Sequence, residues 1–159
     1  MKPKILAKIS RRFEGLPLHH IDTSVILESE STEDGRYCRR YLHLVGNKYR
    51  GAIPFPVMSE FLLAICELAS TKDRYDLLDV FTDLISAKKI VFYAPKNIGG
   101  LLIKIRNLDK RIGPTDREIV ACGIEHGCDA IVTLDKDLIY NEKLENKLGI
   151  KIRHPKELL

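Results

Sequence analysis

The sequence lacks features that would place it in several protein classes. None of its apolar runs approaches the roughly 20 residues of a membrane-spanning helix, so we expect no membrane anchor. Residues 1–16 are basic but contain no long apolar segment, which argues against a secretory signal. The four cysteines form no Cys-x-x-Cys pair, which argues against a zinc ribbon. Cys66 and Cys122 fall in apolar helical patterns, so we expect buried, reduced thiols in a cytoplasmic protein.

The short motifs of several enzyme classes are missing as well. The chain has no Gly-x-Ser-x-Gly, no phosphate-binding G-x-x-x-x-G-K-[ST] and no GxGxxG after a strand. No internal repeat or Pro/Gly-rich linker divides its 159 residues, a length that fits one compact domain. We therefore predict a basic N-terminal extension over residues 1–16 and a single domain over residues 17–159.

The charge is moderately basic, with a net charge of +4 and a pI near 8.8. A polyanionic partner is compatible with this charge, although strongly basic nucleic-acid-binding domains exceed a pI of about 9. Some basic residues could either follow a phosphate backbone or form an ordinary solvated surface, namely Arg11, Arg12, Arg39, Arg40, Lys48 and Arg50.

Strand-like and helix-like segments alternate along the chain. Short β-prone runs predict strands at residues 18–22, 52–53, 89–94, 130–134 and 150–153. Apolar residues with a helical period predict helices over residues 23–29, 36–45, 57–69, 74–86, 97–108, 115–127 and 140–149. Thr23 or Ser24 and Thr115 are the predicted N-caps of two of these helices. This alternation is typical of an α/β fold with a mostly parallel sheet between two layers of helices.

Four acids lie at junctions between these elements. Asp22 ends the first strand, Asp135 ends the fourth, and Glu60 and Asp116 lie in the first turns of two helices. Because the carboxyl ends of parallel strands share one edge of a sheet, we expect the four side chains to converge there. Converging carboxylates repel one another unless a cation lies between them. Mg²⁺ and Mn²⁺ prefer such oxygen ligands, whereas no nearby His or Cys set favours zinc.

Structural roles remain open for some of these acids. Asp22 could cap the helix that follows it, and the helix dipole alone, worth roughly 0.3–1 kcal/mol, could explain Asp116. In the run AIVTLDKDL, we expect Asp135 to face the metal site and Asp137 to cap the next helix or bind an outer water. Of the five histidines, we expect His126 to be solvated.

The motifs around the four acids resemble those of a known family. IDTSVIL (Asp22), SEF (Glu60), TDREIVA (Asp116) and VTLDKDL (Asp135) have the order and approximate spacing found in PIN-domain proteins. These are Mg²⁺- or Mn²⁺-dependent ribonucleases that include the VapC toxins. The resemblance implies a Rossmann-like α/β/α sandwich in which the four acids coordinate the metal. It also implies supporting roles near the metal for four further side chains, namely Asp137, Thr23, Ser24 and Thr133.

The resemblance further implies an endoribonuclease that acts on RNA, as a toxin of a toxin–antitoxin pair or in RNA processing. An antitoxin protein and a second copy of the chain are the expected partners. The extension over residues 1–16 is a departure, because small toxins of this kind usually begin at the first strand. Two rival hypotheses are a non-catalytic PIN-like module that binds RNA or protein, and a phosphoacceptor domain with Asp22 as nucleophile. The latter class expects Asp-x-Asp where this chain has Asp-Thr-Ser.

Overall fold

The structure is a computed structural model that describes residues 15–67, 70–87 and 89–159. The predicted N-terminal extension therefore lies almost entirely outside the described residues. Five strands form one sheet in the order β3-β2-β1-β4-β5, and every neighbouring pair is parallel. The strands are β1 (Leu18–Ile21), β2 (Arg50–Pro54), β3 (Ile90–Tyr93), β4 (Ala130–Val132) and β5 (Ile152–Arg153).

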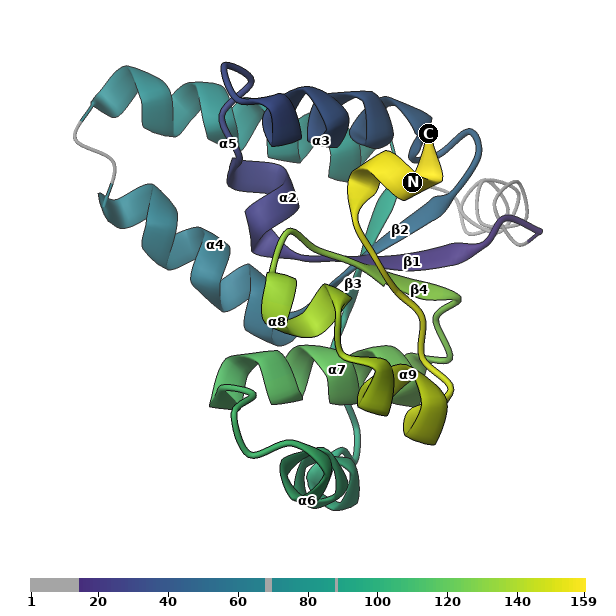
Figure 1. The fold of residues 1–159 in the computed structure, drawn as a ribbon. Helices are drawn as coiled ribbons and strands as arrows, with labels where there is room; N and C mark the ends of the chain where they lie inside the picture. The colour runs from purple at the N-terminus through teal and green to yellow at the C-terminus, as the bar shows by residue number, and fades with distance from the viewer. Residues whose placement is uncertain (1–14, 68–69, 88) are drawn as a thin grey trace, which may run out of the picture.

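Helices cover both faces of this sheet. In Figure 1, α3 and α5 lie above the strands, and α7 and α6 lie below them. The three-layer α/β/α arrangement predicted from the sequence is thus confirmed. The helices are α2 (Thr23–Leu27), α3 (Glu33–Leu44), α4 (Phe55–Glu67), α5 (Thr71–Ser86), α6 (Gly99–Leu108), α7 (Pro114–His126), α8 (Lys136–Ile139), α9 (Glu142–Leu148) and the 3₁₀ helix η1 (Pro155–Leu158).

The central strand β1 is buried on both faces, as expected for a strand between helix layers. Its two histidines point to opposite faces: His19 stacks on Tyr49 with ring centroids 4.2 Å apart, and His20 hydrogen-bonds His126 at 2.7 Å. Burial lowers the pKa of His19 to about 4 and that of His20 to about 3. Both imidazoles are therefore neutral at pH 7. His126, which was predicted to be solvated, is instead half-buried and held by its hydrogen bond to His20.

Two further predictions from the sequence are wrong for local reasons. Helix α7 begins at Pro114 with Gly113 as N-cap, so Thr115 lies inside the first turn and caps nothing. Proline suits this first position, because its missing N–H would have no partner there anyway. Cys66 is exposed near the end of α4, whereas Cys122 is buried as predicted.

Close packing between α7 and β4 depends on a glycine. A Cβ atom on Gly123 would lie 2.9 Å from Cδ1 of Ile131 and 3.1 Å from Sγ of Cys128. The absence of a side chain therefore lets α7 approach the sheet closely at this position.

We expect Gly123→Ala to lower the free energy of unfolding by about 1–3 kcal/mol, because the extra methyl group overpacks this contact. Urea unfolding measures the effect. The control is Gly100→Ala in α6, where nothing lies within 4 Å of the added Cβ. This control should be neutral or stabilising by up to about 1 kcal/mol, since alanine is the better helix former. Equal responses at the two positions would contradict the proposed close contact.

Candidate metal-binding site

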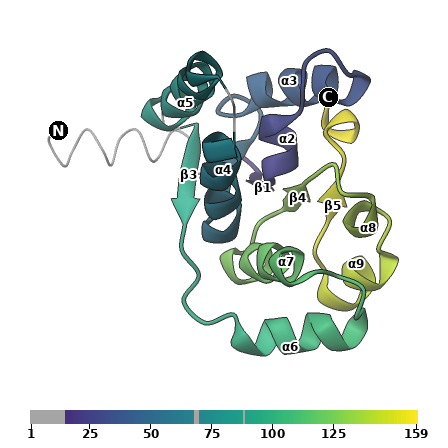
Figure 2. The ribbon, with the colours of Figure 1, turned by 90° about the vertical axis from the view of Figure 1, so that its left-hand side faces the viewer.

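Four elements bring the four predicted acids to the carboxyl edge of the sheet. Asp22 directly follows β1, Asp135 follows β4 after two further residues, and Glu60 and Asp116 lie in α4 and α7. Figure 2 looks onto this side of the molecule, where α2, α4, α7 and α8 surround the strand ends. The alternation of strands and helices correctly predicted where these acids lie.

Asp22 is the most firmly held of the four acids. Its Oδ1 accepts a hydrogen bond from the backbone N–H of Thr23 at 2.8 Å, so Asp22 itself is the N-cap of α2. Its Oδ2 accepts from the hydroxyls of Ser24 and Thr133, both at 2.7 Å. The predicted caps Thr23 and Ser24 are therefore wrong, and the alternative that Asp22 caps its own helix is correct. Each carboxylate oxygen has two lone pairs, so capping leaves room for a metal ligand role.

The two hydroxyls that support Asp22 are fixed in direction. The Ser24 oxygen accepts from the Leu134 backbone N–H at 3.1 Å, and the Thr133 oxygen accepts from the Asp135 N–H at 3.0 Å. Because each oxygen is an acceptor from the backbone, each hydroxyl proton is free to point to Asp22. The loop after β4 is thereby tied to the end of β1.

Glu60 reaches this cluster from α4 through Thr23. The Thr23 hydroxyl lies 3.0 Å from Oε2 of Glu60 and donates to it. Burial raises the pKa of Glu60, and the nearby charge of Asp22 adds to the increase, while the Thr23 hydrogen bond opposes it. Thr23 therefore positions one acid through its backbone and a second through its side chain.

Asp116 is the least compensated acid. It is partly buried in the first turn of α7 and accepts no hydrogen bond from the described residues. Burial raises its pKa to about 6, with further contributions from the charges of Asp135, Asp22 and Glu60 and from that of Asp137. These contributions place all the predicted acids in one electrostatic environment.

Of the two acids in AIVTLDKDL, the helix cap is Asp135 and not Asp137. Asp135 is the N-cap of α8, and its Oδ1 accepts from the Asp137 backbone N–H at 2.7 Å. Asp137 is exposed in the first turn of that helix, so the prediction that it caps the helix is wrong. Asp135 is partly buried and contributes more to the raised pKa of Asp116, which agrees with the prediction that Asp135 is the inner acid.

The cluster fits a hard divalent cation in its donor chemistry. None of the ion pairs among the described residues involves Asp22, Glu60, Asp116 or Asp135, so protein cations leave their charge uncompensated. In residues 15–67, 70–87 and 89–159, no three His, Cys, Asp or Glu side chains form a ready-made metal cage. Mg²⁺ does not need one, because it keeps several waters and is usually bound by one or two carboxylates together with substrate phosphates.

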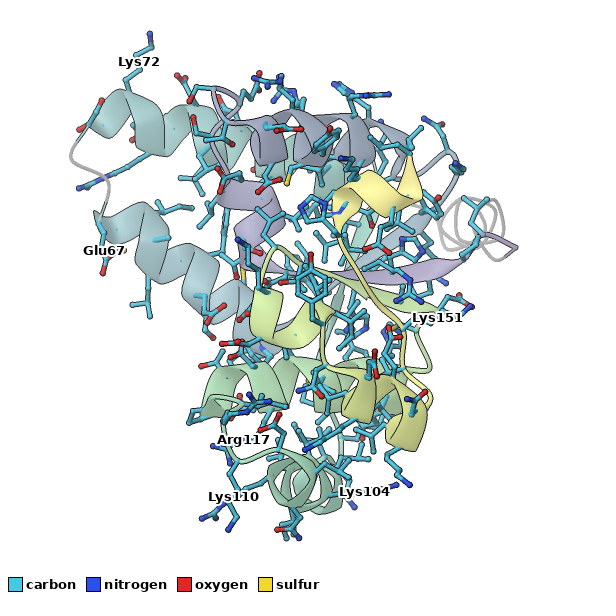
Figure 3. All side chains as sticks on the ribbon, in the orientation of Figure 1. Glu67, Lys72, Lys104, Lys110, Arg117 and Lys151 are labelled. Atoms are coloured by element: carbon cyan, nitrogen blue, oxygen red, sulfur yellow. The ribbon has the colours of Figure 1, made fainter. Side chains whose placement is uncertain are left out.

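Most of the basic residues considered from the sequence do not surround this site. Lys48 and Arg50 lie at the amino end of β2, which is the opposite edge of the sheet, and Arg39 pairs with Glu30. Arg11 and Arg12 lie outside the described residues. Arg117 is the cation next to Asp116 in sequence, and Figure 3 shows it on the side where α7 begins.

Sequence reasoning missed a polar network beside the site, centred on the buried Asp109. The Asp109 carboxylate accepts two hydrogen bonds from the Arg111 guanidinium, at 3.0 and 2.7 Å, and one from the Asn141 amide at 3.1 Å. These bonds lower the pKa of Asp109. The network joins the loop before α7 to the start of α9. The only signal in the sequence was Asn141, a typical N-cap residue before a charged helix.

Comparisons with known proteins agree with this architecture. The model of the PIN domain family matches residues 20–144. Chains of solved structures that superpose on this one include VapBC2 from Rickettsia felis bound to a promoter DNA fragment (TM-score 0.63, 15% identity, 86% of this chain and 98% of that chain). VapBC-1 from nontypeable Haemophilus influenzae superposes with a TM-score of 0.61 and 14% identity, over 87% of this chain and 98% of that chain. PAE2754 from Pyrobaculum aerophilum superposes with a TM-score of 0.53 and 15% identity, over 92% of this chain and 90% of that chain.

No curated protein matches the sequence. At the identities above, the structural likeness concerns the fold. Within the described residues, no helix is both long and apolar enough to span a membrane.

The raised pKa of Asp116 predicts a stability change with pH. An unperturbed aspartate has a pKa of 3.8, so the folded protein binds this proton more tightly than the unfolded chain. The contribution of Asp116 to stability therefore falls as pH rises from about 4 to about 6. In EDTA at pH 7.5, we expect Asp116→Asn to stabilise the protein by about 1 kcal/mol, or ~2–4 °C in Tm, after allowing for solvent screening.

Thermal unfolding at pH 7.5 and pH 4 checks this prediction, because most of the gain should disappear at pH 4, where the wild-type carboxyl is protonated in the folded state and partly protonated in the unfolded chain. Glu118→Gln is the matched control, an exposed acid on the same helix. A loss of stability in Asp116→Asn at pH 7.5 would show that this acid is not under electrostatic strain.

Proposed function

Since this chain belongs to the PIN domain family, we propose that it is a nuclease, and more specifically a Mg²⁺- or Mn²⁺-dependent endoribonuclease. The observation that carries this proposal is the cluster of Asp22, Glu60, Asp116 and Asp135, whose like charges have no cation partner among the described residues. A stable fold has no need of such a cluster, whereas a divalent cation and a phosphodiester together would compensate it. The non-catalytic alternative predicts lost acids and explains the cluster less well.

The roles of the chain's own residues follow from their contacts. Asp22, Glu60, Asp116 and Asp135 would hold the cation, which when bound activates water and offsets the charge that develops on the phosphate. Thr23, Ser24 and Thr133 orient two of these carboxylates through the hydrogen bonds described above. The unprotonated form of Asp116 is required for binding a cation, so its pKa of about 6 in the metal-free protein predicts that cation affinity falls as the pH drops through that value.

We also propose a protein partner, in line with the VapC-like sequence motifs and the VapBC names of the structural relatives. Apolar side chains on α4 support this proposal, since Phe55 is 64% exposed and Leu63 is 66% exposed. Large exposed apolar side chains that lie together often mark an interface. An antitoxin or a second copy of the chain could cover them.

Removal of single acids tests the nuclease proposal. We expect Asp22→Asn and Asp135→Asn to reduce Mn²⁺-dependent cleavage of single-stranded RNA by at least about 100-fold, because each change removes a charge that fixes the cation. Asp137→Asn should reduce it less, since Asp137 is exposed and outside the inner cluster. A gel assay with RNA and with DNA of equal sequence measures the loss and the preference for RNA.

Glu118→Gln is the control and should cleave at the wild-type rate. Unchanged cleavage in Asp22→Asn would rule out the proposed site, and equal losses in Asp135→Asn and Asp137→Asn would show that the two acids share one role.

Metal binding can be measured without any substrate. We expect Mn²⁺ or Mg²⁺ to raise the Tm of the wild-type protein, because a ligand that binds only the folded state stabilises it, by about 2.7 kcal/mol at a hundred times the Kd. Asp116→Asn should lose most of this increase while keeping the higher Tm in EDTA. A metal-dependent Tm that is equal in the two proteins would place the ion elsewhere.

A further inference from the structure

An exposed tyrosine lies at the far end of the short helix that Asp135 caps. Tyr140 is the C-cap of α8, five residues after Asp135, so the two backbones are separated by about 7.5 Å along the helix. Its side chain is 78% exposed and makes no hydrogen bond or ring contact with any described residue. An aromatic ring of this size in water contributes little to the fold, which suggests another role.

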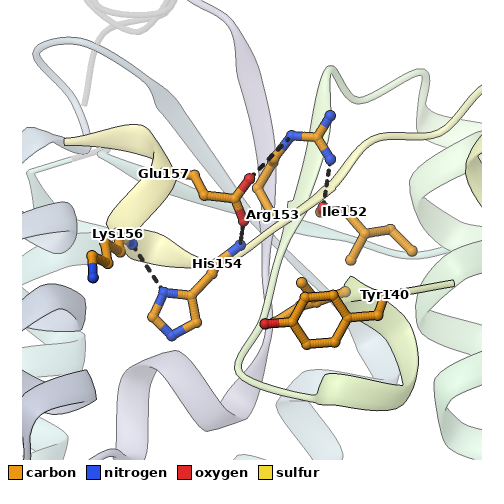
Figure 4. Close-up of a pocket in the computed structure, with 7 residues that line it drawn as sticks. Tyr140, Ile152, Arg153, His154, Lys156 and Glu157 are labelled. Carbon is orange, nitrogen blue, oxygen red and sulfur yellow. Dashed lines mark hydrogen bonds and ion pairs between the residues drawn. The ribbon is translucent and has the colours of Figure 1, made fainter. Parts of the chain in front are cut away.

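Two hollows in the surface meet at this ring. One, of about 460 Å³, lies between Tyr140 and the C-terminal segment that includes Arg153 and His154, and Figure 4 shows Tyr140 across it from His154. The other, of about 340 Å³, extends from Tyr140 to Asp137 and Arg111. Asp137 contributes to the electrostatic environment of Asp116, so the second hollow borders the acidic cluster.

The backbone that carries Tyr140 is firmly anchored even though its ring is free. The preceding residues Leu138 and Ile139 pack against the core, and the following residue Asn141 is buried. Asn141 donates to Asp109 at 3.1 Å and caps α9 by accepting from the Leu144 N–H at 3.3 Å. An exposed ring on an immobilised backbone loses little entropy when a flat ligand stacks on it.

Basic side chains line the hollow that borders the acids. Arg111, Lys136 and Lys143 lie around it together with Asp137 and Glu142. Arg111 is held in place by its two bonds to Asp109, although 84% of its side chain remains exposed. Cations beside a ring suit a nucleic-acid strand, whose phosphates and bases alternate.

We propose that Tyr140 is a base-stacking platform for single-stranded RNA, which holds a nucleotide next to the scissile phosphate while Arg111, Lys136 and Lys143 contact the backbone. This inference rests on the proposed nuclease function and extends it, because it assigns a substrate-positioning site outside the four acids. Stacking on an aromatic ring tolerates every base, so the platform would position the strand without selecting a sequence.

Fluorescence tests stacking without any cleavage. The chain contains no tryptophan, so Tyr140→Trp introduces a single reporter. In the Asp116→Asn background, we expect a short single-stranded RNA of mixed sequence to quench this fluorescence, and an abasic strand of the same length to leave it unchanged. Tyr75→Trp on α5 is the matched control, since Tyr75 is another exposed tyrosine (64%) and lies on a different helix. This variant should show no quenching. Absence of quenching in Tyr140→Trp would overturn the proposal.

Kinetics provide the second measurement. We expect Tyr140→Ala to raise the KM for single-stranded RNA by about 5- to 100-fold with little change in kcat and Tm, because a stacking contact binds substrate and transition state alike. Tyr140→Phe should retain the wild-type KM, as should Tyr75→Ala. An unchanged KM in Tyr140→Ala would overturn the inference and leave the nuclease proposal intact. If the wild-type protein cleaves no RNA, the nuclease proposal fails, and the fluorescence titration still decides whether RNA stacks on Tyr140.

Discussion

The parallel pairing of β1 with β4 is the constraint on which the candidate site depends. Ile21 lies opposite Val132, and the Asp22 N–H donates to the Val132 carbonyl at 2.9 Å, so the two strands end side by side. This register places the Thr133 hydroxyl 2.7 Å from the Asp22 carboxylate. Because side chains alternate along a strand, a shift by one residue would turn Thr133 away from Asp22. The site is therefore a consequence of the sheet.

Sequence patterns predicted the sheet edge and its acids, but of the N-caps discussed above only Asp22 was among the alternatives they offered. An acid that follows a strand and precedes a helix is compatible both with a metal ligand and with a helix cap. Asp22 and Asp135 are both N-caps in the structure. The sequence could not show which of two neighbouring polar residues is the N-cap, because that depends on the residue at which the helix begins. Pro114 was the available signal at α7, since proline favours the first helical position over Thr115.

Contacts between distant segments account for the remaining errors. His126 ends a helix, a position that suggests solvent, yet the fold stacks it on Tyr93 with ring centroids 3.9 Å apart and bonds it to His20. Cys66 fits the apolar period of α4 but faces outward, because the apolar stripe is wider than the surface that this helix buries. Periodicity predicts a helix and its general amphipathic character, whereas the neighbours of each face are set by tertiary packing.

Stability and proposed function make opposite demands on the same carboxylates. Hydrogen bonds from hydroxyls and backbone groups stabilise Asp22 and Asp135, yet Asp116 has none from the described residues and keeps a raised pKa. If all four acids were equally well bonded, a cation would gain less by binding. An acid held in place by a proline-started helix, with its charge uncompensated, is more useful as a ligand than one already satisfied by the protein.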